Sequence, residues 1–382
     1  MSARSGRAGV IVGTLVVAYL GAITLGAYVV GGAVIDAMRA QQTADVVATL
    51  PHQEIVQTTV AQERALATVI DQACAPATPD CTAARMALLN GVPELDQNGE
   101  PVVSNDGEVS FAAPSALQQT VTALDQRDRR LAGLDVGMLD APVRDAIERT
   151  AGDRAAIDKV HDAIETSPGQ AVEAYDQYLQ NATGINTSLA EATDGELRAR
   201  LEAQTLLTEL TLANPQERTL VALSLGTFER GLPNDLEPAA AEIAAMDEQI
   251  AEAQAALGRT SSDRQVPPID GDLAQIRSAI LSGELDGLTP AQAQVFPSAS
   301  ATWGEELRQA RDAVRAETLE LAGNQANVAT NRALLTGGIT VTVLVLALVA
   351  VIVVSVLLLR RRRTPTPPPS AWNQPAVPAM QQ

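Results

Sequence analysis

The stretch Ala61-Gln62-Glu63-Arg64-Ala65-Leu66 recurs 154 residues later as Pro215-Gln216-Glu217-Arg218-Thr219-Leu220. Both copies lie in segments whose apolar residues repeat at spacings of three and four, the pattern of an amphipathic helix. On a helical wheel, each copy turns its glutamate toward the apolar face and sets its arginine at the flank of that face. Each of the two helices therefore carries the same glutamate–arginine pair, with the same orientation relative to its apolar face.

These buried charges allow two interpretations. Adjacent residues on a helix do not face each other, so Glu63 cannot neutralise Arg64, and partners must come from other helices. One interpretation is a network of glutamates and arginines that sets the register of a helical bundle. The other is that Arg64 and Arg218 converge on one small planar oxyanion, which guanidinium forks bind well, with Glu63 and Glu217 in support.

Arg218 has a further feature that favours an anion. Asn214 followed by Pro215 is typical of a helix start, with Asn at the N-cap and Pro in the first turn. We therefore expect one helix over Gly195–Leu212 and a new one over Pro215–Arg230. In that arrangement Arg218 lies near free backbone N–H groups and the positive end of the helix dipole.

Two uncharged segments enclose the motifs. Residues 9–35 and 333–359 contain no charged side chain, and each is long enough to cross a bilayer as a helix. A cleaved signal peptide is the alternative for the first segment. Its apolar stretch, however, exceeds the roughly 7 to 15 residues of a signal-peptide core, and no clear cleavage site follows. We therefore expect two transmembrane helices.

Basic residues flank both segments on their outer ends. Arg4 and Arg7 precede the first, and the run Arg360–Arg363 follows the second. The positive-inside rule then places residues 1–8 and 360–382 in the cytoplasm of a bacterial cell membrane protein, with residues 36–331 outside the cytoplasm.

The composition excludes a nucleic-acid partner and favours helices. The formal net charge is -19, and no basic tract outside the juxtamembrane arginines could neutralise a phosphate backbone. Aromatic residues make up only 2% of an alanine-rich chain in which Lys159 is the sole lysine. Such a composition is typical of helices packed through small and aliphatic side chains, so we expect an all-α protein.

The apolar periodicity divides the outer segment into helices. Besides the two around Pro215, we expect helices over residues 51–74, 117–130, 141–165, 170–189, 236–257, 271–282 and 290–295, and from 298 into the second span. The exception is the segment 92–113, where Asp96-Gln97-Asn98-Gly99 and Asn105-Asp106-Gly107 separate short extended stretches. These turn residues predict a β-hairpin.

The two cysteines, Cys74 and Cys81, lie close together in a Pro-containing stretch. The topology above puts them on the oxidising side of the membrane, so we expect a local disulfide across a loop between helices. A metal site is disfavoured, because the stretch contains no histidine and both His52 and His161 are distant in sequence.

The repeated motif also carries a family resemblance. The runs Val60–Leu66 and Leu206–Leu220 resemble the L-Q-x-E-R-G signature of bacterial nitrate- and nitrite-sensing (NIT) domains. The run Arg149–Tyr178, with Arg154, Ile157, Asp158 and Tyr175, resembles that family's middle segment. The resemblance covers residues 45 to 330 approximately. It implies two four-helix bundles, usually in a homodimer, that bind nitrate or nitrite through one arginine from each motif.

Carried over to this chain, the binding arginines are Arg64 and Arg218. Ala65 and Thr219 stand where the family has glycine, and NIT domains usually precede an effector, whereas this chain has only a Pro-rich tail after its second span. That tail is expected to be a solvated stub or a docking segment for an aromatic-lined groove.

No catalytic or cofactor motif is present, so we expect no enzyme and no cofactor. Two functions remain open. The first is a membrane-anchored sensor that binds a small oxyanion and signals to a separate cytoplasmic protein. The second is an envelope scaffold that kept the helical bundles and lost the ligand.

Overall fold

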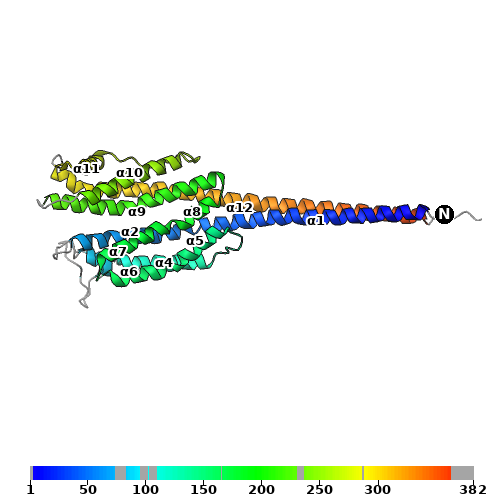
Figure 1. Ribbon diagram of the computed structural model, residues 1–382, viewed down its shortest axis with the longest axis horizontal. Coiled ribbons are helices and arrows are strands. Elements are labelled where there is room, and N and C mark those ends of the chain that lie inside the picture. The colour runs from blue at the N-terminus through cyan, green and yellow to red at the C-terminus, as the bar shows by residue number, and fades with distance from the viewer. Residues whose placement is uncertain are drawn as a thin grey trace, which may run out of the picture. The chain divides into compact units, whose positions relative to one another are not determined.

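The computed structural model describes residues 3–73, 83–94, 102, 110–164, 166–229, 236–285 and 288–362. They belong to two compact units, one from residues 1–37 and 328–382 and the other from residues 38–327. The all-α prediction is confirmed, since helices dominate both units (Figure 1). The elements are α1 (Ala3–Val47), α2 (Leu50–Ala73), η1 (Met86–Asn90), β1 (Val92–Pro93), β2 (Phe111–Ala113), α4 (Ala116–Ala132), α5 (Ala141–Gly152), α6 (Arg154–Ala163), α7 (Pro168–Ala182), α8 (Gly184–Glu191), α9 (Gly195–Glu229), α10 (Glu237–Leu257), α11 (Gly271–Ser282) and α12 (Pro290–Arg362).

The smaller unit contains the apolar parts of α1 and α12. By length and composition, each of these two helices could cross a membrane. They approach each other closely at a glycine, because a Cβ atom on Gly26 would lie 2.7 Å from Cγ2 of Thr340. Small residues at such crossings let two helix backbones pack tightly without a polar contact.

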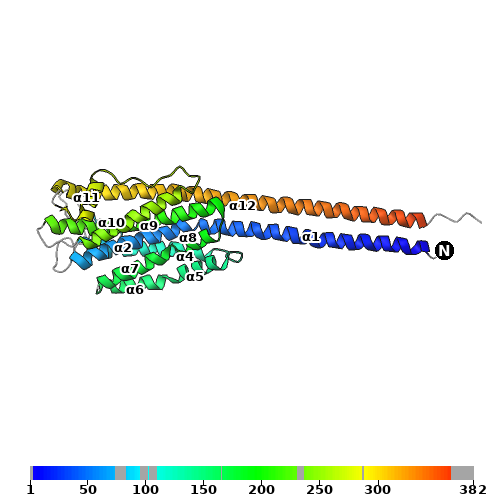
Figure 2. The same cartoon turned by 45° about the horizontal axis from the view of Figure 1, so that its top comes forward.

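Three apolar cores hold the larger unit together. The first, around Leu124 and Tyr175, is enclosed by α2, η1, α4, α6 and α7. The second, around Val221 and Phe296, is enclosed by α9, α10, α11 and α12. A third core around Leu201 joins α5, α8 and α9 to the C-terminal end of α1 and to the middle of α12. Figures 1 and 2 both show α2, α4, α6 and α7 grouped together, and α9 beside α10.

The two helices that carry the repeated motif lie side by side and run in the same direction. Gln204 of α9 donates a 2.6 Å hydrogen bond from Nε2 to Oε1 of Glu54 on α2. Further along both helices, the Thr68 hydroxyl of α2 donates to Oε1 of Gln216 on α9 at 3.3 Å. The residue number rises in both helices between these two contacts. The helices are therefore parallel, and both motifs lie near the Thr68–Gln216 level.

Two predicted helices are interrupted. The helix expected over 141–165 is divided at Asp153 into α5 and α6, and the one expected over 170–189 is divided at Thr183 into α7 and α8. At the second break, the Ala182 carbonyl accepts a 2.7 Å hydrogen bond from Nε2 of Gln57 on α2. Because a buried side chain from another helix takes this carbonyl, α7 can end there without leaving an unpaired polar group.

The helix start expected at Asn214-Pro215 is wrong. The helix α9 continues from Gly195 to Glu229 with Pro215 inside it. Asn214 does not cap a helix but donates from Nδ2 to Oγ of Ser300 on α12 at 3.2 Å. Leu210 and Val221, on either side of the proline, are fully buried in the second core. This packing offsets the hydrogen bond that a proline removes from a helix interior.

The consequence for Arg218 is direct. It lies in the middle of α9 rather than in a first turn, so free N–H groups and a helix N-terminus provide no anion-binding support there. The division expected between 290–295 and the last helix is also wrong, because α12 is continuous through Pro297. Its neighbour Phe296 is fully buried.

The β-hairpin expected over 92–113 is confirmed at its base. Strands β1 and β2 pair in antiparallel fashion, with Val92 opposite Ala113 and Pro93 opposite Phe111. The turn residues between the strands, and the Cys74–Cys81 stretch with its expected disulfide, lie outside the described residues.

Candidate functional site

The first glutamate of the repeated motif is fully buried and faces α6. Oε2 of Glu63 lies 3.0 Å from Nε2 of His161, whose side chain is 12% exposed. The hydroxyl of Tyr175 on α7 is the other polar group beside this carboxylate. Burial, followed by the charge of Glu63, raises the pKa of Tyr175. The contact with His161 therefore ties Glu63 of α2 to α6, as the register-setting interpretation requires.

The first arginine is already neutralised by carboxylates. Arg64, whose side chain is 16% exposed, forms an ion pair with Asp176 of α7. Burial raises the pKa of Asp176, while Arg64 lowers it. Burial also raises the pKa of Glu242 on α10, and there too Arg64 acts in the opposite direction. Arg64 is thus placed among two acidic side chains from two different helices.

The second glutamate pairs with an arginine that lies two helices further along the chain. Glu217 is 1% exposed and forms an ion pair with Arg277 of α11, which is 4% exposed. Arg277 also pairs with Asp247 of α10 and donates from Nη2 to the Ile243 carbonyl at 3.4 Å. Burial raises the pKa of Glu217 despite the opposing effect of Arg277. This glutamate therefore depends on a single buried cation.

The second arginine differs from the other three motif charges. Arg218 is part-buried, and it forms no ion pair with any carboxylate of the residues that the structure describes. Burial lowers its pKa, and the charge of Arg308 on α12 lowers it further. The charged residue that acts on Arg218 is thus a second cation rather than an acid. No hydrogen bond or ion pair joins the side chains of Arg64 and Arg218 within the described part of the chain.

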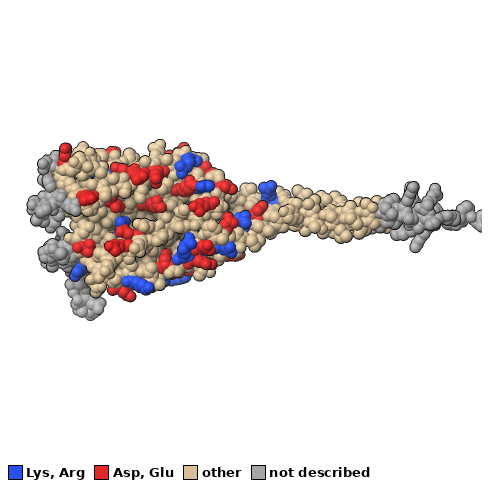
Figure 3. All heavy atoms as spheres, in the orientation of Figure 1, with Lys and Arg blue, Asp and Glu red and all other residues tan. Residues whose placement is uncertain are grey.

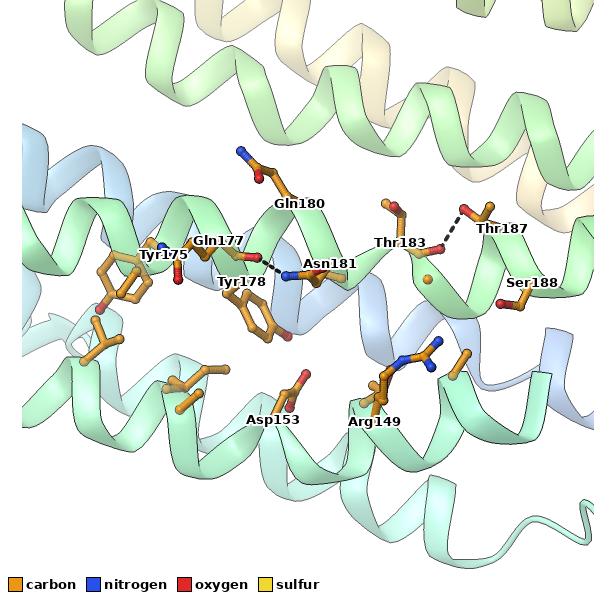
Figure 4. Close-up of a pocket in the computed structure, with 18 of the residues that line it drawn as sticks. Arg149, Asp153, Tyr175, Gln177, Tyr178, Gln180, Asn181, Thr183, Thr187 and Ser188 are labelled. Carbon is orange, nitrogen blue, oxygen red and sulfur yellow. Dashed lines mark hydrogen bonds between the residues drawn. The ribbon is translucent and has the colours of Figure 1, made fainter. Parts of the chain in front are cut away.

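A cavity of about 620 Å³ lies away from both arginines of the motif. It opens where α5 meets α6 and α7 meets α8 (Figure 4). Its polar lining includes Arg149, Asp153, Tyr178, Asn181 and Thr183. The sequence provided no signal for it, because both interrupted helices read as continuous apolar periodicities.

A buried cation next to this cavity was also not predicted. Arg127 of α4 is 1% exposed, and its Nη2 lies 2.8 Å from carboxylate oxygens of both Asp128 and Asp153. Its Nη1 donates to Oε1 of Gln53 on α2 at 3.4 Å. The run of charged residues around Arg127 reads as a solvated helix face, so only the tertiary structure identifies the one that points inward.

A buried layer of polar side chains around Glu54 joins α2, α9 and α12. Glu54 is 2% exposed and accepts hydrogen bonds from Gln204 at 2.6 Å and from Nη1 of Arg315 at 2.8 Å. Nε of Arg311 lies 3.7 Å from the same carboxylate. This layer fixes α12 against both motif helices.

The buried carboxyl groups predict how stability depends on pH. Burial raises the pKa of Asp153, Asp176, Glu209, Glu217 and Glu242. A carboxyl group whose pKa is raised on folding holds its proton more tightly in the folded state than in the unfolded state. Protonation therefore stabilises the folded protein at low pH, and this stabilisation is lost as the pH rises through the folded pKa. We therefore expect the melting temperature of the full chain in detergent to fall as the pH rises from about 4, the ordinary range of these carboxyl groups, toward neutral.

Some carboxyl groups at the surface instead have lowered pKa values, and these affect stability only at lower pH. Hydrogen bonds to Arg308 lower the pKa of Glu305, and those to Arg198 lower that of Glu202, so their contribution is lost only below about pH 4. The measurement is a melting curve at each pH, with Glu242→Gln as the comparison variant, which should show a flatter profile. A melting temperature that climbs steadily from about pH 4 to neutral pH contradicts the expectation.

Comparisons with known proteins add one finding about the fold. No family model matches the chain, and no curated protein matches it. A solved structure described as the NasR transcription antiterminator is similar at a TM-score of 0.51, with 13% sequence identity over 83% of each chain. At that identity the likeness concerns the arrangement of the helices alone.

Proposed function

We propose that this chain is a membrane-anchored, extracytoplasmic sensor that binds a small oxyanion such as nitrate or nitrite. Arg218 is the observation that carries the proposal. A part-buried guanidinium that faces another cation and no described carboxylate is costly when empty, and an anion removes that cost. Arg64, the other arginine of the motif, is paired with Asp176, and Glu63 and Glu217 hold the motif helices in place.

The proposed architecture extends the fold described above. We infer two four-helix bundles, one from α2, α4, α6 and α7 and the other from α9, α10, α11 and α12, supported by the two cores that these groups enclose. The apolar parts of α1 and α12 then anchor the bundles in the membrane, with both termini in the cytoplasm. A homodimer would pass occupancy through these helices to a separate cytoplasmic protein.

A structural scaffold is the second candidate, and a specific observation favours it. Three of the four motif charges, Glu63, Arg64 and Glu217, already have partners on neighbouring helices. Such a network maintains the register of a bundle without any ligand. The two candidates differ in whether an oxyanion stabilises the protein.

The test is the melting temperature of the full chain in detergent, in nitrate or nitrite and in chloride at equal ionic strength. A bound anion stabilises the folded state by mass action, by about 2.7 kcal/mol at a hundredfold excess over Kd. Arg218→Ala should abolish the gain, and Arg218→Lys should restore it poorly because lysine lacks the planar fork. Identical melting in all three anions would favour the scaffold.

A further inference from the structure

Arg64 and Arg218 differ in how available they are for a ligand. An anion at Arg64 must displace Asp176 and lie near Glu242, and both of these carboxylates would repel it. Arg218 has no such competitor among the described residues, and its charged neighbour is Arg308. The charged neighbour is an acid in the first case and a base in the second.

The register of α9 and α12 shows how Arg218 and Arg308 come together. Nη1 of Arg200 on α9 lies 2.8 Å from Glu317, whereas Asn214 contacts Ser300, so the two helices are antiparallel. They pack closely at Gly304, where a Cβ atom would lie 2.4 Å from Oδ1 of Asn214. A larger residue at position 304 would require the Asn214 side chain to shift, which would disturb its hydrogen bond to Ser300.

Arg218 follows Asn214 by one helical turn, and Arg308 follows Gly304 by one turn. Side chains on a helix lean toward its N-terminus. Arg218 therefore leans back toward Asn214, and Arg308 leans back toward Gly304, from opposite sides of the same helix contact. Both side chains can therefore reach toward that contact, and the charge of Arg308 does lower the pKa of Arg218.

The existing partner of Arg308 is easily exchanged. Arg308 is 41% exposed and pairs with Glu305, one turn earlier on the same helix and 53% exposed. Exposed pairs of this kind contribute little to stability, because water and salt screen them. An oxyanion with several acceptor atoms can replace Glu305 while it also neutralises Arg218.

We propose that Arg308 of α12, and not Arg64, supplies the second guanidinium that holds an oxyanion against Arg218. This inference rests on the proposed function and changes which pair of helices the ligand joins. The anion bridges α9 to α12, the helix that also contains the second candidate membrane span. Occupancy then acts on that helix directly, without passing through α2.

The experiment compares variants of the full chain in detergent by their nitrate-dependent shift in melting temperature, with chloride at equal ionic strength as the reference. Arg308→Gln, which keeps length and polarity, should weaken nitrate binding by roughly tenfold or more. Arg64→Gln should keep the wild-type nitrate affinity, as should the control Arg264→Gln at an exposed arginine of the same unit. Glu305→Gln frees Arg308 and should strengthen nitrate binding.

The outcomes separate this inference from the proposed function. If Arg64→Gln loses the shift and Arg308→Gln keeps it, Arg308 is not the second ligand, although the chain remains an oxyanion sensor. Loss of the nitrate-dependent shift in both Arg64→Gln and Arg308→Gln would also contradict the assignment of the anion to Arg218 and Arg308 alone. A wild-type chain that does not respond to nitrate overturns both ideas. Melting in chloride identifies any variant that has failed to fold, and the gain expected from Glu305→Gln requires no loss of structure at all.

Discussion

Replacing Arg277 by methionine should lower the free energy of unfolding by about 3 to 5 kcal/mol. The substitution keeps the volume of the side chain but leaves the carboxylate of Glu217, which is 1% exposed, buried beside Asp247 with no cation. Removing one member of a buried pair is costly because the remaining charge has lost both its counter-ion and its water. The measurement is thermal or denaturant unfolding of the full chain in detergent.

A double variant shows whether the stranded charge is the cause. Glu217→Gln added to Arg277→Met removes that charge, so the pair together should recover most of the lost stability. Arg198→Met is the matched control, because Arg198 forms an exposed pair with Glu202 within one helix and should show no measurable change. A double variant as unstable as Arg277→Met would mean that packing, rather than charge, explains the loss.

The second large effect is all-or-none and concerns membrane topology. A fluorescent protein fused after Gln382 should fold and fluoresce, since the basic residues that flank both spans predict a cytoplasmic C-terminus. Alkaline phosphatase inserted next to Asn105 should be active, because that enzyme requires the oxidising side of the membrane. Each reporter at the other position should be silent, and that exchange provides the control. Phosphatase that is inactive next to Asn105 but active after Gln382 would reverse the orientation.

The sequence predicted the helices well where the cause was local. Apolar periodicity identified α2, α4, α10 and α11 to within a few residues, because each buries one continuous face. It failed where a distant residue decides the outcome. The break at Thr183 depends on Gln57, and the continuity of α9 through Pro215 depends on packing against α12.

The candidate site was likewise predictable only in part. The burial of Glu63 and Glu217 followed from their position on a helical wheel, and the structure confirms it. Their partners did not follow, because a histidine on α6 and an arginine on α11 come from segments without any shared pattern. The difference between Arg64 and Arg218 was invisible for the same reason. It depends on Asp176 and Arg308, which lie 112 and 90 residues from the arginines that they face.

The different charged neighbours of the two motif arginines have a consequence for redesign. Arg64 lies among two acids from later helices, Asp176 and Glu242, whereas Arg218 lies near Arg308. The sign of these neighbours decides whether a motif arginine has a partner within the protein. Arg308→Asp should therefore pair the second arginine in the manner of the first, whereas freeing Arg64 requires both Asp176→Asn and Glu242→Gln. Under the proposed function, anion binding could then be retuned one motif at a time, without altering the helices that carry the motifs.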